Sequence, residues 1–516
     1  MKTIAITGAS GAMGKETLKA VMSSHHNFKV KLLLLNSDRF FGSKIKRQFK
    51  DRVSIIYGDI RTYQNCLDLV SGSDYVLHLA ALIPPKADKN QNTTISVNYG
   101  GTKNIVDAIN SLPKKPKLVH ISTVAIYGNR NYLHPWGRVG DPLLPSIFDV
   151  YATSKMKAER YVLESNLPHF VVLRQTGILY DDLLINNISD GLMFHTPWNT
   201  PIEWVTAVDS GQLMMRILER DLNGDINCFW NKVYNIGGGH GCRQTGYDVF
   251  DNGFKIIGGT VEEFFEPLWN AENNFHCFWF SDSDVLNNLF QFQSESSRYF
   301  WDEYKKKHPL YSVAKILPPK LLRKMIIEPL LCDKNAPMRW LKDNNTPRIT
   351  AIYDKNTLQN SHCSWHDYPL LKNNRVPTGY FDYEKIISEP NYNRLNHGYD
   401  ESKHDSELDL EDMKQVAKYR GGECLSTNMI KGDLYTPLQW RCHKGHVFFA
   451  TPYTILKAGH WCDSCAPLTI WDYDLTVPHI PFYQQIWYDT HNKEERKVFA
   501  IVDNETFITR GSYHES

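Results

Sequence analysis

The sequence predicts an α/β protein built on a doubly wound parallel sheet, with a small second lobe and a C-terminal α+β extension that holds a metal-binding module. Three observations predict this fold class. Short apolar runs alternate with helical patterns over the first 130 residues, a glycine-rich turn joins the first run to the first helix, and cysteines and histidines gather near the C-terminus. Strands that alternate with helices form right-handed βαβ units, so the sheet is expected to be parallel.

Buried parallel strands are expected wherever a short apolar run is bounded by turn residues. In chain order these runs are Thr3–Thr7, Lys29–Leu35, Val53–Tyr57, Tyr75–Leu79, Lys117–Ser122, Phe170–Leu173 and Val233–Asn235. Helical patterns lie between them, for example at Gly14–Ser24 and Thr102–Ser111. The pattern loses regularity after about Phe250, and residues 301–420 are expected to form helices and loops.

Size and charge limit the classes of function. A chain of 516 residues suggests two to four domains. Lys plus Arg is 58 and Asp plus Glu is 57, and a net charge of +1 does not support a large nucleic-acid or membrane-surface footprint. No run of 18 apolar residues occurs, and the N-terminal pattern is that of a strand rather than a secretory signal. Ten cysteines, clustered late in the chain, fit a reducing compartment, so the cytoplasm is expected.

The glycine-rich turn, TGASGAMG from Thr7 to Gly14, lies where the first strand meets the first helix. In such a turn one glycine permits the tight bend, another lets backbone amides approach a pyrophosphate, and a third lets the helix pack against the strand. The free N–H groups of the helix then face the phosphates. This context predicts a dinucleotide site.

Residues 1–300 resemble the extended short-chain dehydrogenases/reductases, also called the NAD-dependent epimerase/dehydratase family, and their Rossmann domain with a substrate lobe. Besides the glycine turn, the matching segments are Tyr57–Ile60, His78–Ala81, Asn98–Thr102, Trp204–Asp209 and Tyr234–Gly237. The resemblance implies an NAD(P) cofactor. It assigns cofactor binding to Gly8, Ser10, Gly11, Met13, Gly14, Asn36, Arg39, Asp59, Ile60, Leu79, Ala80, Ala81, Asn98, Tyr151, Lys155 and Gln175.

The end of the second strand bears on the choice between NAD and NADP. NAD-specific members place an acidic residue there, which binds the ribose hydroxyls and repels a 2′-phosphate. The matching residue is Asn36, and Arg39 follows closely. This pattern favours NADP, with Asp38 as the alternative ribose ligand.

Tyr151 and Lys155 lie four positions apart at the start of a predicted helix, so both side chains lie on one helical face. A nearby ammonium favours the phenolate of a tyrosine. By resemblance, Thr123 holds the family's catalytic Ser/Thr position and orients the substrate oxygen while Tyr151 moves the proton. The expected catalytic residues are therefore Thr123, Tyr151 and Lys155.

Two departures from the family pattern limit the chemistry. The 4,6-dehydratases of the family carry Asp-Glu directly after the threonine, whereas this chain has Val124 and Ala125, which cannot transfer protons. Sugar dehydration by that route is not expected. The family's Arg-Pro element appears as Arg174-Gln175, and both a substrate hydrogen bond and a neutral substitution are open for Gln175.

Four residues near the C-terminus have the spacing of a zinc site. Cys442 and His446 form one close pair, and Cys462 and Cys465 form another. Four sulfur and nitrogen ligands suit tetrahedral Zn²⁺ and leave no open position, so the metal is expected to be structural. The segment resembles treble-clef or zinc-ribbon domains. Alternative ligands are His443, His460 and Cys424.

These observations predict a cofactor-binding domain at 1–300, a connecting region at 301–420 and a zinc-binding domain at 421–516. The favoured function is an oxidoreductase that transfers a hydride between nicotinamide and a secondary alcohol or ketone of a small-molecule substrate. A nucleotide-sugar epimerase that retains NAD is the alternative within this class. A regulatory protein that senses NADP(H) is a non-enzymatic alternative. No membrane or nucleic-acid partner is expected, and a homodimer is left open.

Overall fold

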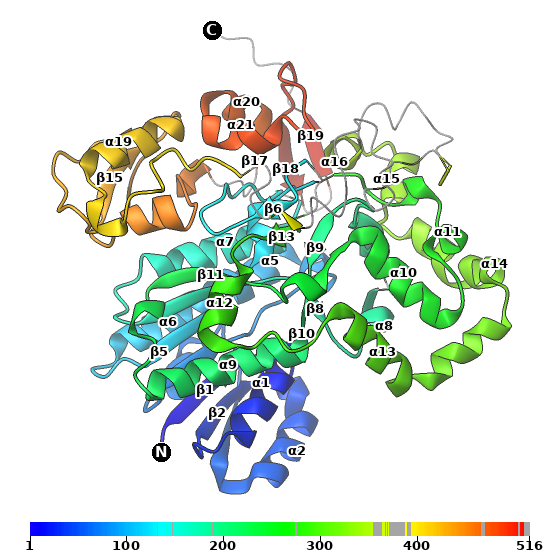
Figure 1. Ribbon diagram of the computed structural model, residues 1–516, viewed down its shortest axis with the longest axis horizontal. Helices are drawn as coiled ribbons and strands as arrows, with labels where there is room; N and C mark the ends of the chain where they lie inside the picture. The colour runs from blue at the N-terminus through cyan, green and yellow to red at the C-terminus, as the bar shows by residue number, and fades with distance from the viewer. Residues whose placement is uncertain are drawn as a thin grey trace.

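The computed structural model describes the chain except for residues 132, 147, 188–189, 274–275, 354–363, 367, 369, 371–387, 390–393, 466–469, 504–505 and 510–516. Its central element is a seven-stranded parallel sheet with the strand order β11-β7-β5-β4-β1-β2-β3 (Figure 1). The strands are β1 (Thr3–Thr7), β2 (Lys29–Leu34), β3 (Val53–Tyr57), β4 (Tyr75–His78), β5 (Lys117–Thr123), β7 (Phe170–Gln175) and β11 (Lys232–Ile236).

All seven strands that the sequence predicts are present: β1 and β3 have the predicted ends, and the ends of the other five differ by at most two residues. The doubly wound parallel sheet is therefore confirmed. The largest difference is at β7, which continues from Leu173 to Gln175 because it pairs with β5 as far as Thr123 and with β11 as far as Ile236. This extension places Gln175 beside Thr123 at the carboxyl end of the sheet.

Helices cover both faces of the sheet, as the alternation of buried side chains along each strand requires. On one face, Ile4 and Ile6 of β1 pack in one core with the helices α1 and α9. On the other face, Ala5 packs with α3, α6 and α7. These helices are α1 (Ala12–Ser23), α2 (Arg39–Phe49), α3 (Tyr63–Val70), α6 (Gly101–Ser111), α7 (Val150–Leu163) and α9 (Ala207–Leu222).

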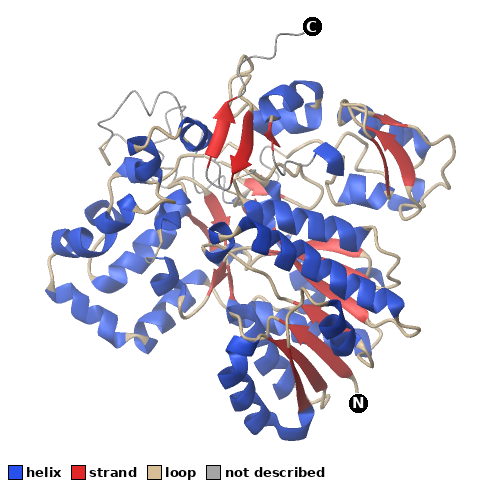
Figure 2. Ribbon diagram, turned by 180° about the vertical axis from the view of Figure 1, so that it is seen from behind, coloured by secondary structure: helices blue, strands red, loops and turns tan. Residues whose placement is uncertain are grey.

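A second lobe lies beside the sheet and continues into the connecting region (Figure 1 and Figure 2). Its core joins Phe194 and Trp198 to Phe264 and Phe265, and it extends to Leu322 and Ile327 of the connecting region. In the described part of the lobe, short strands pair as three two-stranded sheets: β10 (Val205–Thr206) with β8 (Ile178–Leu179), β12 (Arg243–Thr245) with β9 (Pro201–Glu203), and β13 (Trp279–Phe280) with β6 (Trp136–Gly137). Its longer helices are α10 (Gly246–Ile257), α13 (Ser297–Lys307), α15 (Pro337–Lys342) and α16 (Thr346–Ile352). The helix α12 (Ser283–Phe290) packs instead in the sheet core that contains α1 and α9.

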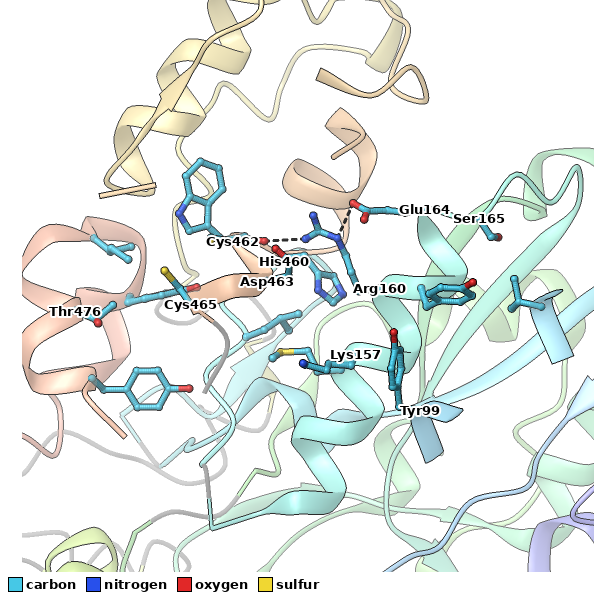
Figure 3. Close-up of a pocket in the computed structure, with 18 of the residues that line it drawn as sticks. Tyr99, Lys157, Arg160, Glu164, Ser165, His460, Cys462, Asp463, Cys465 and Thr476 are labelled. Carbon is cyan, nitrogen blue, oxygen red and sulfur yellow. Dashed lines mark hydrogen bonds and ion pairs between the residues drawn. The ribbon is translucent and has the colours of Figure 1, made fainter. Parts of the chain in front are cut away.

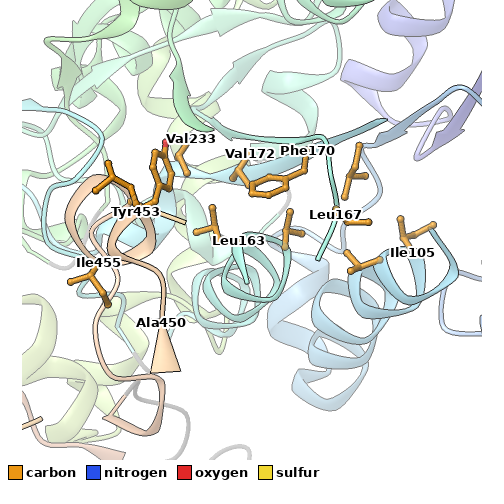
Figure 4. Packing of buried hydrophobic residues seen from close by; sticks show 14 of the residues in the cluster. Ile105, Leu163, Leu167, Phe170, Val172, Val233, Ala450, Tyr453 and Ile455 are labelled. Carbon is orange, nitrogen blue, oxygen red and sulfur yellow. Dashed lines mark hydrogen bonds between the residues drawn. The ribbon is translucent and has the colours of Figure 1, made fainter. Parts of the chain in front are cut away.

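The C-terminal part contains a small antiparallel sheet, β14 (Glu423–Cys424), β15 (Leu438–Arg441) and β16 (Val447–Ala450), preceded by α19 (Leu410–Tyr419). Its apolar residues share one core with the sheet domain: Tyr453 and Ile455 lie beside Val233 and Leu163 (Figure 4). The helices α20 (Tyr473–Thr476) and α21 (Pro481–Trp487) and the strands β17–β19 follow.

None of the helices in the described part of the chain is long and apolar enough to span a bilayer.

Candidate functional site

The glycine turn has the close contacts that its three glycines predict. Gly8 has a φ of +73°, and a Cβ there would lie 2.7 Å from the backbone nitrogen of Ala80. A Cβ on Gly14 would lie 2.1 Å from the carbonyl oxygen of Gly8, so α1 can pack this close to β1 only because residue 14 is glycine. Gly11 is the N-cap of α1, and no side chain caps this helix. The helix N-terminus is thus free of side-chain competitors for an anion.

The residues next to the glycine turn lie either in the core or in the Leu79–Ala81 loop that contacts the turn. The Met13 side chain is buried in the core. The Leu79–Ala81 loop follows β4, and the backbone nitrogen of Ala80 donates to Thr7 Oγ1 over 3.2 Å. The buried Asn98 braces the end of this loop, because its amide accepts from Leu82 N at 2.8 Å and donates to Leu82 O at 3.1 Å.

One carboxylate, one amide and one guanidinium lie at the far end of the turn: Asp38, Asn36 and Arg39. Ser10 Oγ donates to Asp38 Oδ2 over 2.8 Å, which ties Asp38 to the glycine turn. Arg39 donates to Asn36 Oδ1 over 2.9 Å and lies 4.5 Å above the ring of Tyr57. The turn therefore has an anion and a cation next to each other where an adenosine ribose would lie.

Asp59 and Ile60 follow β3. Hydrogen bonds from Arg61, at 2.7 and 3.0 Å from its side chain and 2.8 Å from its backbone, lower the pKa of Asp59. The buried Ile60 side chain packs so closely on α6 that a Cβ at Gly101 would be 2.5 Å from its Cδ1. Ile60 therefore fixes this turn mainly through packing.

Thr123, Tyr151 and Lys155 come together at the carboxyl end of β5. Thr123 is the last residue of β5, and Tyr151 lies in the first turn of α7, hydrogen-bonded to Thr123. Burial raises the pKa of Tyr151 to about 12, and the bond with Thr123 acts in the opposite direction. Lys155 is 2% exposed and donates to the carbonyl oxygen of Ile121 over 2.6 Å.

Lys155 is buried near the titratable side chains of Glu159 and His78. Burial lowers its pKa to about 8, whereas the charge of Glu159 raises it. Burial and the Lys155 charge also lower the pKa of His78 to about 3, so that ring is neutral. His78 is held between Thr7 Oγ1 at 2.8 Å and Thr102 Oγ1 at 3.0 Å. The Lys155 ammonium group thus lies one helical turn from the Tyr151 phenol.

Glu159 continues the face of α7 that carries Tyr151 and Lys155, and it is fully buried. Its carboxylate accepts from Ser122 Oγ at 2.6 Å and from Arg174 Nη2 at 2.6 Å. His460 Nε2, 301 positions along the chain, is 2.9 Å from Glu159 Oε1. This buried ion pair joins three parts of the chain behind the catalytic residues. The i+8 spacing from Tyr151 is the sequence signal that could have identified Glu159.

Gln175 is 8% exposed and pairs in register with Thr123 on the neighbouring strand. Its Nε2 donates to Thr176 O at 3.2 Å, whereas its Oε1 has no hydrogen-bond partner among the described residues. A buried acceptor without a partner is costly unless a ligand or water donates to it. Gln175 Oε1, at the carboxyl end of the sheet, can therefore accept a hydrogen bond from a bound cofactor.

A cavity of about 570 Å³ lies next to this site, between the sheet domain and the connecting region. It reaches Asp149, the N-cap of α7 two residues before Tyr151. Charged and aromatic groups from distant segments line it, among them Asp88, His195, His276, Trp340 and Arg348. Sequence reasoning missed these residues, because no motif marks them.

Two titratable groups of the cavity have shifted pKa values. Burial, with the charge of Asp149, raises the pKa of Asp88 to about 7. Burial lowers the pKa of His195 to about 4, so this histidine is neutral. Its Nε2 lies 2.6 Å from the carbonyl oxygen of Asn335 and must carry the proton, which leaves Nδ1 as an acceptor. The cavity thus offers one carboxyl that titrates near neutral pH and one imidazole acceptor.

The four predicted metal ligands lie together in the small C-terminal sheet. Cys442 follows β15 and His446 precedes β16, whereas Cys462 and Cys465 lie in a later turn. The Cys442 and Cys465 sulfurs are 3.6 Å apart, and His446 Nδ1 is 3.3–3.6 Å from the three sulfurs. Zn–S and Zn–N bonds of about 2.3 and 2.0 Å in a tetrahedron imply ligand separations of about 3.5–3.8 Å. The ligand atoms therefore have the spacing of a closed tetrahedral site.

The alternative ligands lie elsewhere. His460 contacts Glu159, and the His443 ring stacks on His479 at 5.4 Å. Cys424 lies in β14, outside the metal-ligand cluster found among the described residues.

The turn that contains Cys462 packs directly on the helix α7, which carries Tyr151 and Lys155. Arg160 of α7 donates to the carbonyl oxygen of Trp461 over 2.8 Å and pairs with Glu164 at 2.6 Å (Figure 3). Arg174 Nη2 donates to the carbonyl oxygen of Ala458 over 2.6 Å. The turn before Cys462 is thus bonded to both ends of the Glu159–Arg174 pair.

Known proteins resemble part of the chain. Among curated relatives, the 3 beta-hydroxysteroid dehydrogenase/Delta 5-->4-isomerase of vaccinia virus (strain Ankara) is 26% identical over 175 residues, which are 32% of this chain and 47% of the relative. The protein of the same name from monkeypox virus is 26% identical over 172 residues, with the same coverage. The chain thus spans about half the length of the curated relatives it matches.

Solved structures with a related fold include two dTDP-glucose 4,6-dehydratases. The one from Bacillus anthracis, in complex with NAD, has a TM-score of 0.47 and 18% identity, and covers 61% of this chain and 98% of its own. A double mutant from Streptomyces venezuelae, with NAD bound, has a TM-score of 0.48 and 17% identity, and covers 61% and 100%.

The family model that matches this chain is that of the NAD dependent epimerase/dehydratase family, and the match extends over residues 4–175. This segment contains the glycine turn, Thr123, Tyr151, Lys155 and Gln175. Residues 4–175, about a third of the chain, are therefore similar to the NAD dependent epimerase/dehydratase family.

Proposed function

We propose that the protein is an NAD(P)-dependent oxidoreductase that interconverts a secondary alcohol and a ketone. The observation that supports this most directly is the meeting of Thr123, Tyr151 and Lys155 at the carboxyl end of β5, where open α/β sheets bind their ligands. A protein that only sensed the cofactor would not need this proton-transfer set.

In the proposed mechanism, a bound nicotinamide cofactor supplies hydride donation and acceptance. Thr123 Oγ1 orients the substrate oxygen by a hydrogen bond, and Tyr151 Oη gives a proton to that oxygen or takes it away. The Lys155 ammonium stabilises the phenolate form of Tyr151 by its charge. For this role Lys155 must exchange its bond with Ile121 O for one with the cofactor ribose or Tyr151.

For the cofactor we propose NADP in preference to NAD, with Arg39 as the partner of the 2′-phosphate. Its guanidinium is exposed and held over Tyr57 at the end of the glycine turn. The bond between Ser10 and Asp38 supports the opposite preference, since a carboxylate there would accept from the ribose hydroxyls. The two preferences differ in which side chain contacts the 2′ position.

The substrate in this proposal binds in the cavity beside Asp149. Its walls come partly from the connecting region, through Trp340 and Arg348, whose guanidinium lies 4.7 Å above the Trp340 ring. Asp88 and His195 would bind or exchange protons with polar groups of the substrate. The connecting region would thus choose the substrate while the sheet domain performs the chemistry.

We also propose that Cys442, His446, Cys462 and Cys465 hold a structural zinc ion. Three thiolates and a neutral imidazole around Zn²⁺ carry a net charge of −1. The buried Arg420 packs on the ring of Phe482 and bonds the turn that carries the ligands. Its Nη1 donates to the carbonyl oxygens of Gly459 and His460, just before Cys462.

The function is tested by Tyr151→Phe, with Tyr161→Phe on the same helix as the matched control. Secondary alcohols, 3β-hydroxysteroids and nucleotide sugars are incubated with NADP⁺ or NAD⁺, and absorbance of the reduced nicotinamide is followed. Loss of the proton donor should lower turnover about 10²–10⁴-fold while cofactor affinity stays within about threefold. Tyr161 bonds Asp107 at 2.6 Å, outside the site, so its variant should retain full turnover.

Cofactor that stays bound through turnover, instead of being released, would favour the epimerase alternative. Equal turnover of Tyr151→Phe and wild type would refute the assignment.

A further inference from the structure

Six large aliphatic side chains project into solvent along one short segment of the connecting region. They lie on a 3₁₀ turn (Pro309–Ile316), the helix α14 (Pro319–Leu322) and a π turn (Arg323–Ile327). Leu310 and Ile316 are each 80% exposed and Met325 is 62% exposed. We call this set the apolar ridge: Leu310, Val313, Ile316, Leu317, Leu321 and Met325.

The ridge stands on a packed base. Leu322 and Ile327 of the same segment are buried in the core of the second lobe, and Ala314 and Ile326 pack against that core. The segment is therefore apolar on its outer face as well as its inner face. A surface helix of a water-soluble protein has polar groups on its outer face, so a cluster of exposed apolar side chains indicates an interaction surface.

Exposed lysines surround the ridge. Lys305, Lys306 and Lys307 end the preceding helix α13, and Lys315, Lys320 and Lys324 alternate with the ridge residues. Residues 305–325 contain these six lysines and Arg323 but no Asp or Glu. Acidic residues from outside this segment pair with three of these cations: Glu303 with Lys306, Asp181 with Lys307, and Glu266 and Glu328 with Arg323. The cations beside the ridge that have no ion-pair partner among the described residues are Lys305, Lys315, Lys320 and Lys324.

We propose that the apolar ridge and its lysines dock this protein on the surface of an anionic membrane. Aliphatic side chains that enter the acyl region, together with lysines at the headgroup level, are the features of interfacial membrane binding. Such docking needs no spanning helix and agrees with the absence of one in the described part of the chain.

The composition of the ridge favours a lipid surface over another protein. Protein interfaces are enriched in aromatic residues and depleted in lysine, whereas the ridge has no aromatic residue and a lysine surround. A second copy bound ridge to ridge would bring two lysine clusters together and would repel itself.

The position of the ridge leaves it accessible to a flat surface. It lies at the outer edge of the second lobe near α14, on the opposite side of the molecule from the zinc-ligand sheet (Figure 1 and Figure 2). A membrane could contact it there without reaching the glycine turn.

The test is co-sedimentation of the full chain with vesicles of phosphatidylcholine alone or with about one third phosphatidylserine. We expect binding to the anionic vesicles that weakens between about 0.1 and 0.5 M salt, because exposed charges are screened. The triple variant Leu310→Ser/Ile316→Ser/Met325→Ser should weaken binding at least about tenfold, since each side chain loses apolar burial.

The matched control is Ile430→Ser/Phe449→Ser, which removes two side chains that are 76% and 63% exposed on the C-terminal part of the chain. It should bind vesicles like wild type. Circular dichroism and cofactor titration establish that each variant is folded.

Three results would overturn the proposal. The first is that wild type does not sediment with anionic vesicles, and the second is that the folded triple variant sediments as much as wild type. The third is that wild type forms a dimer that the triple variant abolishes, which would make the ridge a contact between copies.

Discussion

Replacement of Glu159 by glutamine should destabilise the protein, because it breaks the buried ion pair that Glu159 of α7 forms with Arg174. Burial alone would raise the pKa of this carboxyl, but Arg174 and His460 lower it from 4.5 to about 2. At about 1.4 kcal/mol for each factor of ten in the proton affinity, this lowered pKa corresponds to about 3–4 kcal/mol at neutral pH. Arg174 would remain fully buried without its carboxylate, and breaking such a pair costs about 3–5 kcal/mol.

The pH dependence has a definite sign. Because the folded-state pKa is lowered, the contribution of Glu159 is fully present above about pH 4.5 and is lost as pH falls toward about 2. The difference in unfolding free energy between wild type and Glu159→Gln should therefore be constant from pH 5 to 7 and shrink below that range.

The assay is urea unfolding followed by tryptophan fluorescence, with amide hydrogen exchange to locate the effect. Glu164→Gln is the matched control on the same helix, because Glu164 is 31% exposed and its buried partner Arg160 keeps its bond with the carbonyl oxygen of Trp461. That pair should contribute less than about 1 kcal/mol. Exchange should increase in α7 and in the turn at Ala458–Trp461, where His460 loses its partner. A loss below about 1 kcal/mol for Glu159→Gln at pH 7, equal to the control, would refute the reasoning.

Three further predictions concern the metal, the cofactor and Lys155. Elemental analysis should find one zinc per chain. The Cys462→Ser variant should lose this zinc, and its small C-terminal sheet should unfold locally, because the metal supplies folding free energy. A variant that kept its zinc would contradict the proposed ligands. NADPH should bind more tightly than NADH in a fluorescence titration, and Arg39→Ala should reduce the difference between the two affinities. A preference for NADH would show that Asp38 contacts the ribose. Lys155→Met should abolish turnover yet raise the thermal midpoint at pH 7, since burial lowers the pKa of Lys155 to about 8 and so disfavours its charged form. This stabilisation should shrink as pH rises from about 8 toward 10.5, and a lowered midpoint at pH 7 would contradict it.

Local patterns were enough to predict the sheet and much of the candidate site. Each strand is a short apolar run, and its position depends mainly on neighbouring residues, so the seven predicted strands match the structure within one or two residues at each end. The contacts of Gly8 and Gly14 follow from a turn of a few residues, as does the pairing of Cys442 with His446. The boundaries of the three predicted regions and the roles of the site residues stay predictions.

The sequence by itself therefore determined the order of the elements, the dinucleotide turn, the Tyr151–Lys155 face and the metal ligand pairs, because each depends on spacing within one or two elements. Only the tertiary structure decided which distant side chains meet. His460 reaches Glu159 across 301 positions, and the cavity beside Asp149 is closed by Arg348 from the connecting region. The exposure of Leu310 and Ile316 was likewise undetermined, since the same apolar residues would be core if another element covered them. Such contacts depend on how complete elements pack, and no local spacing encodes that packing.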